Sequence, residues 1–286
     1  MTTFPTSGPV SVVVDLTGGG LRLVASERDD AVVTVVPANP EKSADVRLAE
    51  VTRVELSDGV LTVASPRDLR LYLPMNSGMV AVAIEVPTGS SLRGRLSAGS
   101  LDTEGRLGAV DVTLSAGNVR IDEAERLDVK ASAGSIVAGR VAGPATVRAS
   151  AGSVRIREVG GESTIKSANG ETTIGAVTGA LTINGAHANV VVGRVAGSLV
   201  AKASYGNLRV ERVESGSVNL TTSYGSVEVG VPEGTAALLD ASSKNGAVRN
   251  HLSASAGPVA DEAIAEVHAT TGYGDIVVRR PDPFMF

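Results

Sequence analysis

A short phrase built around a glycine recurs from residue 97 onward, and its spacing restricts the fold more than any other feature. The first copies read Ser-Ala-Gly, then Ser or Asn, then an aliphatic residue, as in Ser97–Leu101 and Ser150–Val154. Later copies drift but keep an anchor residue, and the spacing stays near 18 until the last two intervals, of 21 and 28. The anchors are Gly99, Gly117, Gly134, Gly152, Gly170, Ala188, Gly206, Gly225, Gly246 and Gly274. Such a sustained period is typical of stacked, similar units.

Within each unit, alternate residues are apolar. Aliphatic residues dominate two and four places after the anchor, as at Val119 and Ile121, whereas the place between them is mostly polar, as at Arg120. This period of two is typical of a strand with one buried face. A second run of the same kind follows a turn, as in Ala145–Ala149. Each unit is therefore predicted to be strand, turn, strand, turn.

These units predict an all-β fold, namely a single-stranded parallel β-helix (β-solenoid) with about 18 residues per coil. Eighteen residues at about 3.3 Å each trace a closed loop of about 60 Å, and successive coils stack about 4.8 Å apart. Residues one coil apart, such as Val119, Ile136, Val154 and Val190, are expected to form buried piles. The anchor glycine suits a sharp corner that needs a positive φ or a close backbone approach. Ala188 then requires a milder or shifted corner.

Competing folds explain the pattern less well. An antiparallel sandwich does not require small residues at constant spacing, and a doubly wound fold needs helices between its strands. The one segment with a helix-like pattern is Pro258–Ala269, inside the 28-residue interval, which we interpret as an insertion or a lateral cap.

We expect two parts in the chain. Residues 1–96 are strand-like but lack the phrase, and they are predicted to cap or begin the solenoid, because an open end would expose unpaired strand edges. Residues 97–286 are predicted to form regular coils, with an insertion near 250–270 and a C-terminal tail. In that tail, Phe284 and Phe286 would cover the last coil or dock onto another subunit.

Composition excludes several kinds of chemistry. The chain has no cysteine, which excludes disulfides, thiolate metal sites and a cysteine nucleophile. Its net charge of −5 gives no overall attraction to nucleic acid or an anionic membrane. The first eight residues lack the basic and apolar regions of a secretory signal, and no apolar run approaches the length of a membrane span. We therefore expect a cytoplasmic protein with neither a membrane nor a nucleic acid as its partner.

Several segments together resemble a known family. The segments are Val14–Asp29, Lys42–Val46, Ile84–Gly89, the Ala-Gly-Ser/Asn coils and Thr271–Arg279. With these features, the chain resembles the bacterial putative-adhesin family of β-strand-repeat proteins, in particular its actinobacterial members without a signal peptide. The resemblance covers essentially the whole chain. It implies a single-stranded, right-handed β-helix, and it supplies no catalytic residues.

The sequence offers weak candidates for catalysis. Glycoside hydrolysis needs two carboxylates about 5 to 9.5 Å apart. The acidic residues of the early coils occupy scattered positions, which favours a solvent-exposed acidic surface over a catalytic pair. No spacing links the three histidines to one another, and the Gly18–Gly20 run is predicted to be a hairpin turn rather than a phosphate loop. We expect no catalytic site, metal or cofactor. The residues considered are Asp102, Asp111, Asp122, Glu123, Glu125, Asp128, His187, His251 and His268.

One basic column is a candidate binding surface. Its members are 18 residues apart and outward-facing: Lys130, Arg148, Lys166, Asn184 and Lys202. At about 4.8 Å per coil, four cations would lie within about 20 Å and repel one another. A sequence selected for stability alone would more plausibly mix signs, although duplication of a repeat also produces similar columns. The column is therefore predicted to bind an acidic protein surface or an anionic polymer.

A second column contains tyrosines, each placed directly before an anchor. Tyr205 and Tyr224 lie one coil apart, and Tyr273 occupies the equivalent place after the insertion. Exposed tyrosines in register suit a platform for stacking a sugar or peptide. Packing of the aromatic rings at the corner is the simpler explanation of this column.

The predicted function is that of a non-catalytic interaction or scaffolding protein, adhesin-like, that binds a protein or polymer on its flat faces. One alternative is a carbohydrate-active β-helix enzyme. Another is a self-assembling filament subunit, a homo-oligomer formed through the coil ends, since parallel edges are open to pairing.

Overall fold

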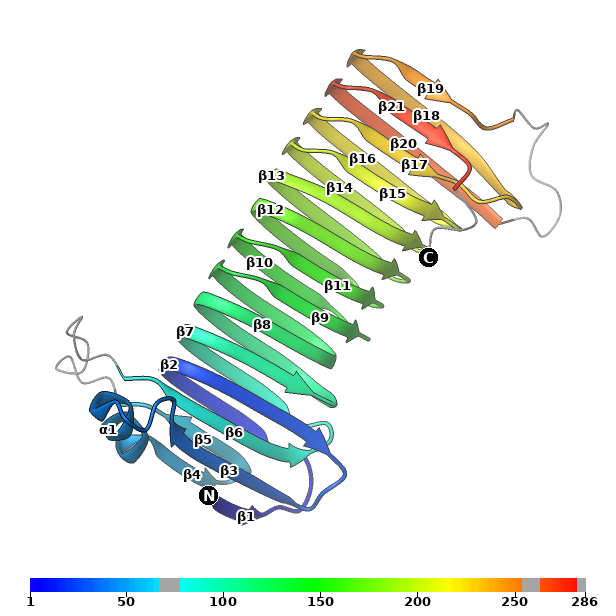
Figure 1. The fold of residues 1–286 in the computed structure, drawn as a ribbon. Coiled ribbons are helices and arrows are strands. Elements are labelled where there is room, and N and C mark those ends of the chain that lie inside the picture. Colours follow the sequence, from blue (N-terminus) through cyan, green and yellow to red (C-terminus); the bar gives the residue numbers. More distant parts are fainter. Residues whose placement is uncertain (67–77, 254–262, 282–286) are drawn as a thin grey trace. The chain divides into compact units, whose positions relative to one another are not determined.

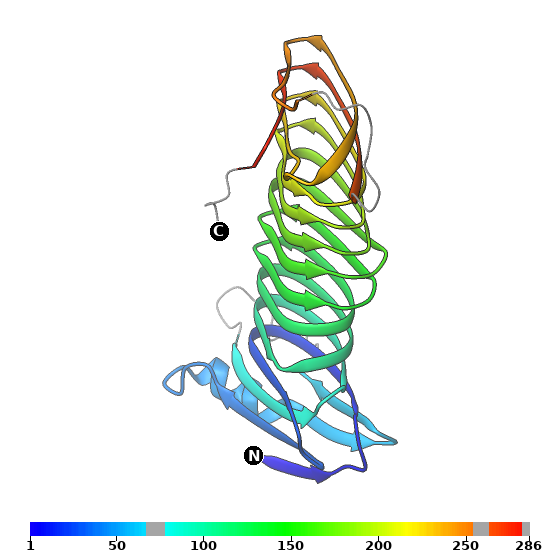
Figure 2. The same ribbon diagram turned by 90° about the vertical axis from the view of Figure 1, so that its right-hand side faces the viewer.

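The computed structural model describes residues 1–66, 78–253 and 263–281, and it is almost entirely β-structure. The chain forms two compact units, Met1–Arg140 (unit 1) and Val141–Phe286 (unit 2). In each unit, strands wind into coils that lie above one another (Figures 1 and 2). No helix among the described residues is long and apolar enough to cross a membrane.

Unit 1 begins its coils earlier than the repeated phrase does. Its elements are β1 (Thr2–Pro5), β2 (Ser11–Ser26), β3 (Asp30–Pro37), α1 (Ser43–Val51), β4 (Arg53–Ser57), β5 (Val60–Ala64), β6 (Val80–Pro87), β7 (Ser91–Glu104) and β8 (Arg106–Ala133), and β9 (Ile136–Val141) follows at the boundary. Strand β2 pairs in parallel with β7, and β7 with β8, so that Leu21, Leu101 and Val119 align.

The predicted hairpin at Gly18–Gly20 is wrong. These glycines lie inside β2, and Gly19 aligns with the anchor Gly99 in the parallel neighbour β7. Gly19 has a φ of +129°, so the run forms a corner of a coil. The glycine run alone does not distinguish the two geometries, because both use positive φ.

Antiparallel strands and a helix cover the first coils of unit 1. Strands β5 and β6 pair with the two halves of β2, then β4 pairs antiparallel with β5, β3 with β6, and β1 with β3. Helix α1, which the sequence pattern did not predict, contacts β3 and β6 (Figure 1). Its buried Asp45 accepts hydrogen bonds from the backbone N–H groups of Asn39 (3.1 Å) and Met79 (3.0 Å). This carboxylate therefore links the helix to the segment after β3 and to the residue directly before β6.

Unit 2 contains the most regular coils. Its strands are β10 (Ala145–Ala151), β11 (Val154–Val159), β12 (Ser163–Val177), β13 (Ala180–Val195), β14 (Ser198–Tyr205), β15 (Leu208–Val213), β16 (Gly216–Tyr224), β17 (Val227–Gly230), β18 (Thr235–Asn245), β19 (Val248–Asn250), β20 (Ala263–Tyr273) and β21 (Ile276–Arg279).

The predicted stacking of coils is confirmed within each unit. In unit 2, parallel pairing aligns Val154, Thr172, Val190, Leu208 and Val227, and all five side chains are buried. In unit 1, Leu101, Val119 and Ile136 are equally buried. The β-solenoid fold is therefore established, and the right-handed winding stays a prediction.

The anchor glycines make corners of the predicted kind. Gly117 has a φ of +135°, and a Cβ there would lie 1.7 Å from the carbonyl oxygen of Gly99 in the neighbouring coil. At Ala188 the corner is made without a positive φ, and the methyl group is buried. The expected change of corner at this position is therefore confirmed.

The last coils are stacked in a different order from the order in which their strands follow along the chain. Strand β20 lies between β16 and β18, and β21 lies between β17 and β19, so the pile runs Val227, Ile276, Val248. The coil of β18 and β19 is outermost (Figure 1), and Val248 remains 43% exposed. The helix-like pattern at Pro258–Ala269 is misleading, because residues 263–269 belong to β20. Residues 258–262, Phe284 and Phe286 lie outside the described residues.

Candidate functional site

The basic column is formed in unit 2 by four neighbouring strands. Parallel pairing places Arg148 of β10 beside Lys166 of β12, Lys166 beside Asn184 of β13, and Asn184 beside Lys202 of β14. The three cationic side chains are exposed. The next member of the column is Thr221, where the positive charge ends.

Lys130, the first residue of the predicted column, belongs to unit 1. It is exposed at the end of β8, and its Nζ lies 3.8 Å from Asp128 Oδ1. Its charge therefore has a local acidic partner, and the binding surface considered below is restricted to unit 2.

An open groove runs beside the basic column. It has a volume of about 400 Å³ and is lined by three consecutive coils: Arg148, Ala149, Ser150, Lys166, Ser167, Ala168, Asn184, Gly185 and Ala186. Small residues make up most of this lining, so the longer side chains of the basic column project beyond the small residues beside them. We name this surface, together with Lys202, the basic groove. Sequence analysis missed the groove, although the small residues Ser150, Ala168 and Ala186 repeat every 18 residues.

Two cations of the basic groove, Lys166 and Lys202, differ from the paired cations found elsewhere in unit 2. Neither Lys166 nor Lys202 forms an ion pair within the described part of the chain. By contrast, the outward face of β15, β17 and β21 mixes signs: Glu228 lies 3.7 Å from Arg209 Nε and 2.7 Å from Arg279 Nε. A column without carboxylates keeps its positive potential and attracts anions.

The tyrosine column is a continuous stack of four aromatic rings. His187, Tyr205, Tyr224 and Tyr273 are spaced 4.9 Å apart between ring centroids, with interplanar angles of 8°, 5° and 4°. In-register pairing of β13, β14, β16 and β20 produces this spacing. The expected alignment of the tyrosines is confirmed, and His187, which directly precedes the anchor Ala188, completes the stack.

The stack limits what the tyrosines can bind. Each of the three tyrosines is about half exposed, but the faces of Tyr205 and Tyr224 are covered by their neighbours. A sugar ring would therefore meet ring edges and hydroxyls rather than an open face. The binding role of Tyr205 and Tyr224 stays a prediction.

The structure also brings together three ionisable residues that the sequence did not connect. His268 of β20 has its Nε2 3.0 Å from Glu266 Oε1 and its Nδ1 3.4 Å from Asp240 Oδ2 of β18. Hydrogen bonding to Glu266, and then to Asp240, raises the pKa of His268. The cluster joins the last two coils through exposed side chains. The third histidine, His251, donates its backbone N–H to Val278 O at 2.8 Å.

Three acids of the early coils have local partners in the structure. Asp111 lies 3.8 Å from Arg93, Glu125 lies 2.7 Å from Arg106, and Asp122 accepts the N–H of Gly105 at 3.1 Å. Each of these acids is engaged with a neighbouring cation or backbone donor. The described residues contain no cluster of three side chains able to hold a metal ion.

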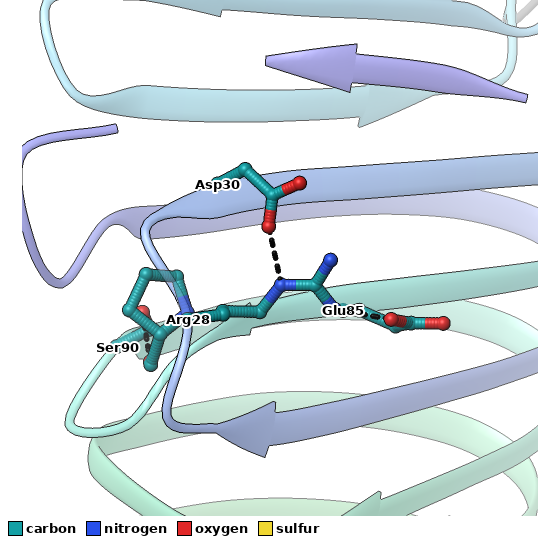
Figure 3. A network of polar contacts seen from close by, with 5 residues as sticks. Arg28, Asp30, Glu85 and Ser90 are labelled. Atoms are coloured by element: carbon teal, nitrogen blue, oxygen red, sulfur yellow. Dashed lines mark hydrogen bonds and ion pairs between the residues drawn. The ribbon is translucent and has the colours of Figure 1, made fainter. Parts of the chain in front are cut away.

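Another polar network, also in unit 1, stabilises its capping strands (Figure 3). The Arg28 guanidinium donates to Asp30 Oδ1 at 2.7 Å and to Glu85 of β6. Ser90 Oγ accepts the N–H of Val10 at 3.0 Å and donates to the Pro87 carbonyl at 2.6 Å. A shared cation neutralises both carboxylates, so this network favours a structural role.

Comparisons with known proteins identify the family. The chain is similar to solved structures described as a putative adhesin from Bacteroides fragilis (13% identity, 97% of this chain, 95% of that chain, TM-score 0.35), a putative adhesin from Parabacteroides merdae (12%, 97%, 94%, 0.33) and a putative lipid binding protein from Parabacteroides distasonis (10%, 97%, 95%, 0.35). No curated protein matches the chain. The family model described as Toastrack DUF4097 matches residues 12–279. The resemblance to putative adhesins is confirmed, and the chain belongs to the Toastrack DUF4097 family.

Proposed function

We propose that the protein is a non-catalytic binding scaffold, and that the basic groove of unit 2 binds a linear anionic polymer. The observation that carries the proposal is a column of exposed cations without carboxylates, beside a groove floored by small residues. Because the groove is lined by three consecutive coils, a polymer lying across the strands would meet one long polar side chain about every 4.8 Å.

The rigidity of the coils supports this function. Parallel backbone pairing holds Arg148, Lys166 and Lys202 at fixed steps along the column. The protein therefore orders little of its own backbone on binding, which lowers the entropic cost of association. Asn184 lies between two lysines and offers an uncharged hydrogen-bond donor.

The expected affinity of one groove is modest. An exposed ion pair contributes about 0.2–1 kcal/mol, so three cations together contribute about 1–3 kcal/mol. A polymer that presents many anionic groups would gain further affinity through repeated engagement. Binding should weaken at high ionic strength, because exposed charges are screened.

The test compares heparin, an anionic polysaccharide, with neutral dextran by isothermal titration calorimetry at low and at high ionic strength. We expect heparin alone to bind, with salt-sensitive affinity. The variant Arg148→Ser/Lys166→Ser/Lys202→Ser should weaken heparin binding by about 5- to 150-fold. A control with the same change in net charge, Arg120→Ser/Arg155→Ser/Arg157→Ser, should bind as the wild type does.

Two outcomes would contradict the proposal. Equal binding by the groove variant and its control would exclude the basic groove as the contact surface. Shortening of the polysaccharide during incubation, measured by size-exclusion chromatography, would favour the carbohydrate-active enzyme instead.

A further inference from the structure

The outermost coil of unit 2, formed by β18 and β19, leaves its inward side exposed. In β20, the inward column of Ala265, Val267, Ala269 and Thr271 is fully buried beneath β18. The matching residues of β18 are exposed or half-buried: Ala237, Leu239, Ala241 and Ser243. Among the described strands, β18 pairs on one side only, with β20. One complete row of backbone donors and acceptors thus lacks a strand partner in the described part of the chain.

Apolar side chains on the outward face extend this surface. Leu238 of β18 is 64% exposed and Ile264 of β20 is 56% exposed. Together with Val248 and the inward residues of β18, they form what we name the open end. An edge strand of eleven residues without proline is a ready template for another strand.

The edges of unit 1 are built differently. Its outermost strands, β1 and β4, have four and five residues; β1 ends at Pro5, and β4 carries Arg53 and Glu55 on its exposed side. Short, charged or proline-containing strands are the devices that prevent edge pairing. Head-to-tail growth into a filament needs two complementary edges, and these strands are poor partners for β18.

We propose that two copies of this chain associate through their open ends, with β18 of one copy paired antiparallel to β18 of the other. In a dimer with two-fold symmetry, the same surface of each copy contacts its equivalent in the other copy. Such an assembly stops at two copies. The charges of β18 fit such pairing. Centring the pair on Ser242 places the exposed Asp240 of each copy opposite the exposed Lys244 of the other, whereas centring it on Asp240 would oppose like charges.

The first experiment measures the mass of the full-length chain by sedimentation velocity over a range of concentrations. We expect a reversible dimer of twice 28.9 kDa. The variant Ala241→Lys puts a charge on the inward side of β18, within the stretch Leu239–Asn245 that this register pairs, and should raise the dimer dissociation constant about tenfold or more. Ala133→Lys, at an exposed position in β8, is the matched control and should dimerise as the wild type does.

The second experiment tests the antiparallel geometry. The chain contains no cysteine, so Ser242→Cys introduces a single thiol at the predicted two-fold axis. Directly opposed residues in an antiparallel pair have Cα atoms about 4.5–5.5 Å apart, within the range that a disulfide spans. Mild oxidation should give a covalent dimer for Ser242→Cys and none for the control Ala133→Cys.

Each contrary result overturns the proposal. A wild-type chain that stays monomeric at every concentration would show that the open end is not an interface between copies. A dimer that Ala241→Lys leaves unchanged would place the interface elsewhere, and larger assemblies that grow with concentration would favour the filament.

Discussion

A methyl group added at one anchor corner should destabilise unit 1 severely. At Gly117, with its φ of +135°, an added Cβ would lie 1.7 Å from the carbonyl oxygen of Gly99 and 2.8 Å from its carbonyl carbon. These atoms belong to the backbone, so they move only if the coils separate. The left-handed conformation costs alanine about 1–2 kcal/mol, and overpacking a close contact costs a further 1–3 kcal/mol or so. Gly117→Ala should therefore lower the free energy of unfolding by about 2–5 kcal/mol, a large share of the roughly 5–15 kcal/mol typical of a native protein.

The matched control is Gly20→Ala, in the same unit. A Cβ there would meet only Ser100 Oγ, at 3.5 Å, an ordinary contact, and Gly20 is not among the residues with positive φ. This variant should change stability by less than about 1 kcal/mol. Urea unfolding followed by circular dichroism measures both variants, and hydrogen exchange of the β7 and β8 amides locates the change. If Gly117→Ala proves as stable as Gly20→Ala, close backbone stacking is not the reason for glycine at the anchors.

Three further predictions concern side chains that join neighbouring elements. The pKa of His268, measured by NMR titration, should lie above that of a free histidine and fall in Glu266→Gln. Because the pKa of His268 is raised in the folded state, its contribution to the stability of the folded chain is complete below the unfolded-state pKa. That contribution is lost as the pH rises through the folded-state pKa. For Asp45, burial opposes ionisation, but hydrogen bonds from the backbone and from Lys42 lower its pKa overall. Its contribution to the stability of the folded chain should therefore be lost as the pH falls through the folded-state pKa. Asp45→Asn should lower the free energy of unfolding, measured in urea at neutral pH, by about 1–3 kcal/mol. In the ring stack, Tyr224→Ala removes two contacts of about 0.5–1.5 kcal/mol each, whereas Tyr224→Phe should unfold at nearly the wild-type urea concentration.

Much of the fold was predictable because a parallel coil repeats the same environment at every turn. A residue that must be buried in one coil must be buried in the next, so Val154 and Val190 carry a periodic signal. The corner glycines carry the same signal, since each Cβ would meet the coil below. The positions of Arg148, Lys166 and Lys202 in one column followed from the same period.

The candidate site was only partly predictable. The column of cations is periodic, but the groove beside it depends on the heights of neighbouring side chains, which a single column does not report. His187 joined the aromatic stack because its ring adopts the plane of Tyr205, a matter of side-chain packing. The cluster of His268, Glu266 and Asp240 depends on which coils are neighbours.

Local alternation, repeated at a fixed period, is enough to predict the coil, its length and the faces of its strands. How the stack ends became apparent only in the folded chain. Strands β18 and β20 carry the same alternation, so nothing local distinguishes an outermost strand from an inner one. Their order depends on the total free energy of pairing with β16, and that placed β20 inside and left β18 at the edge.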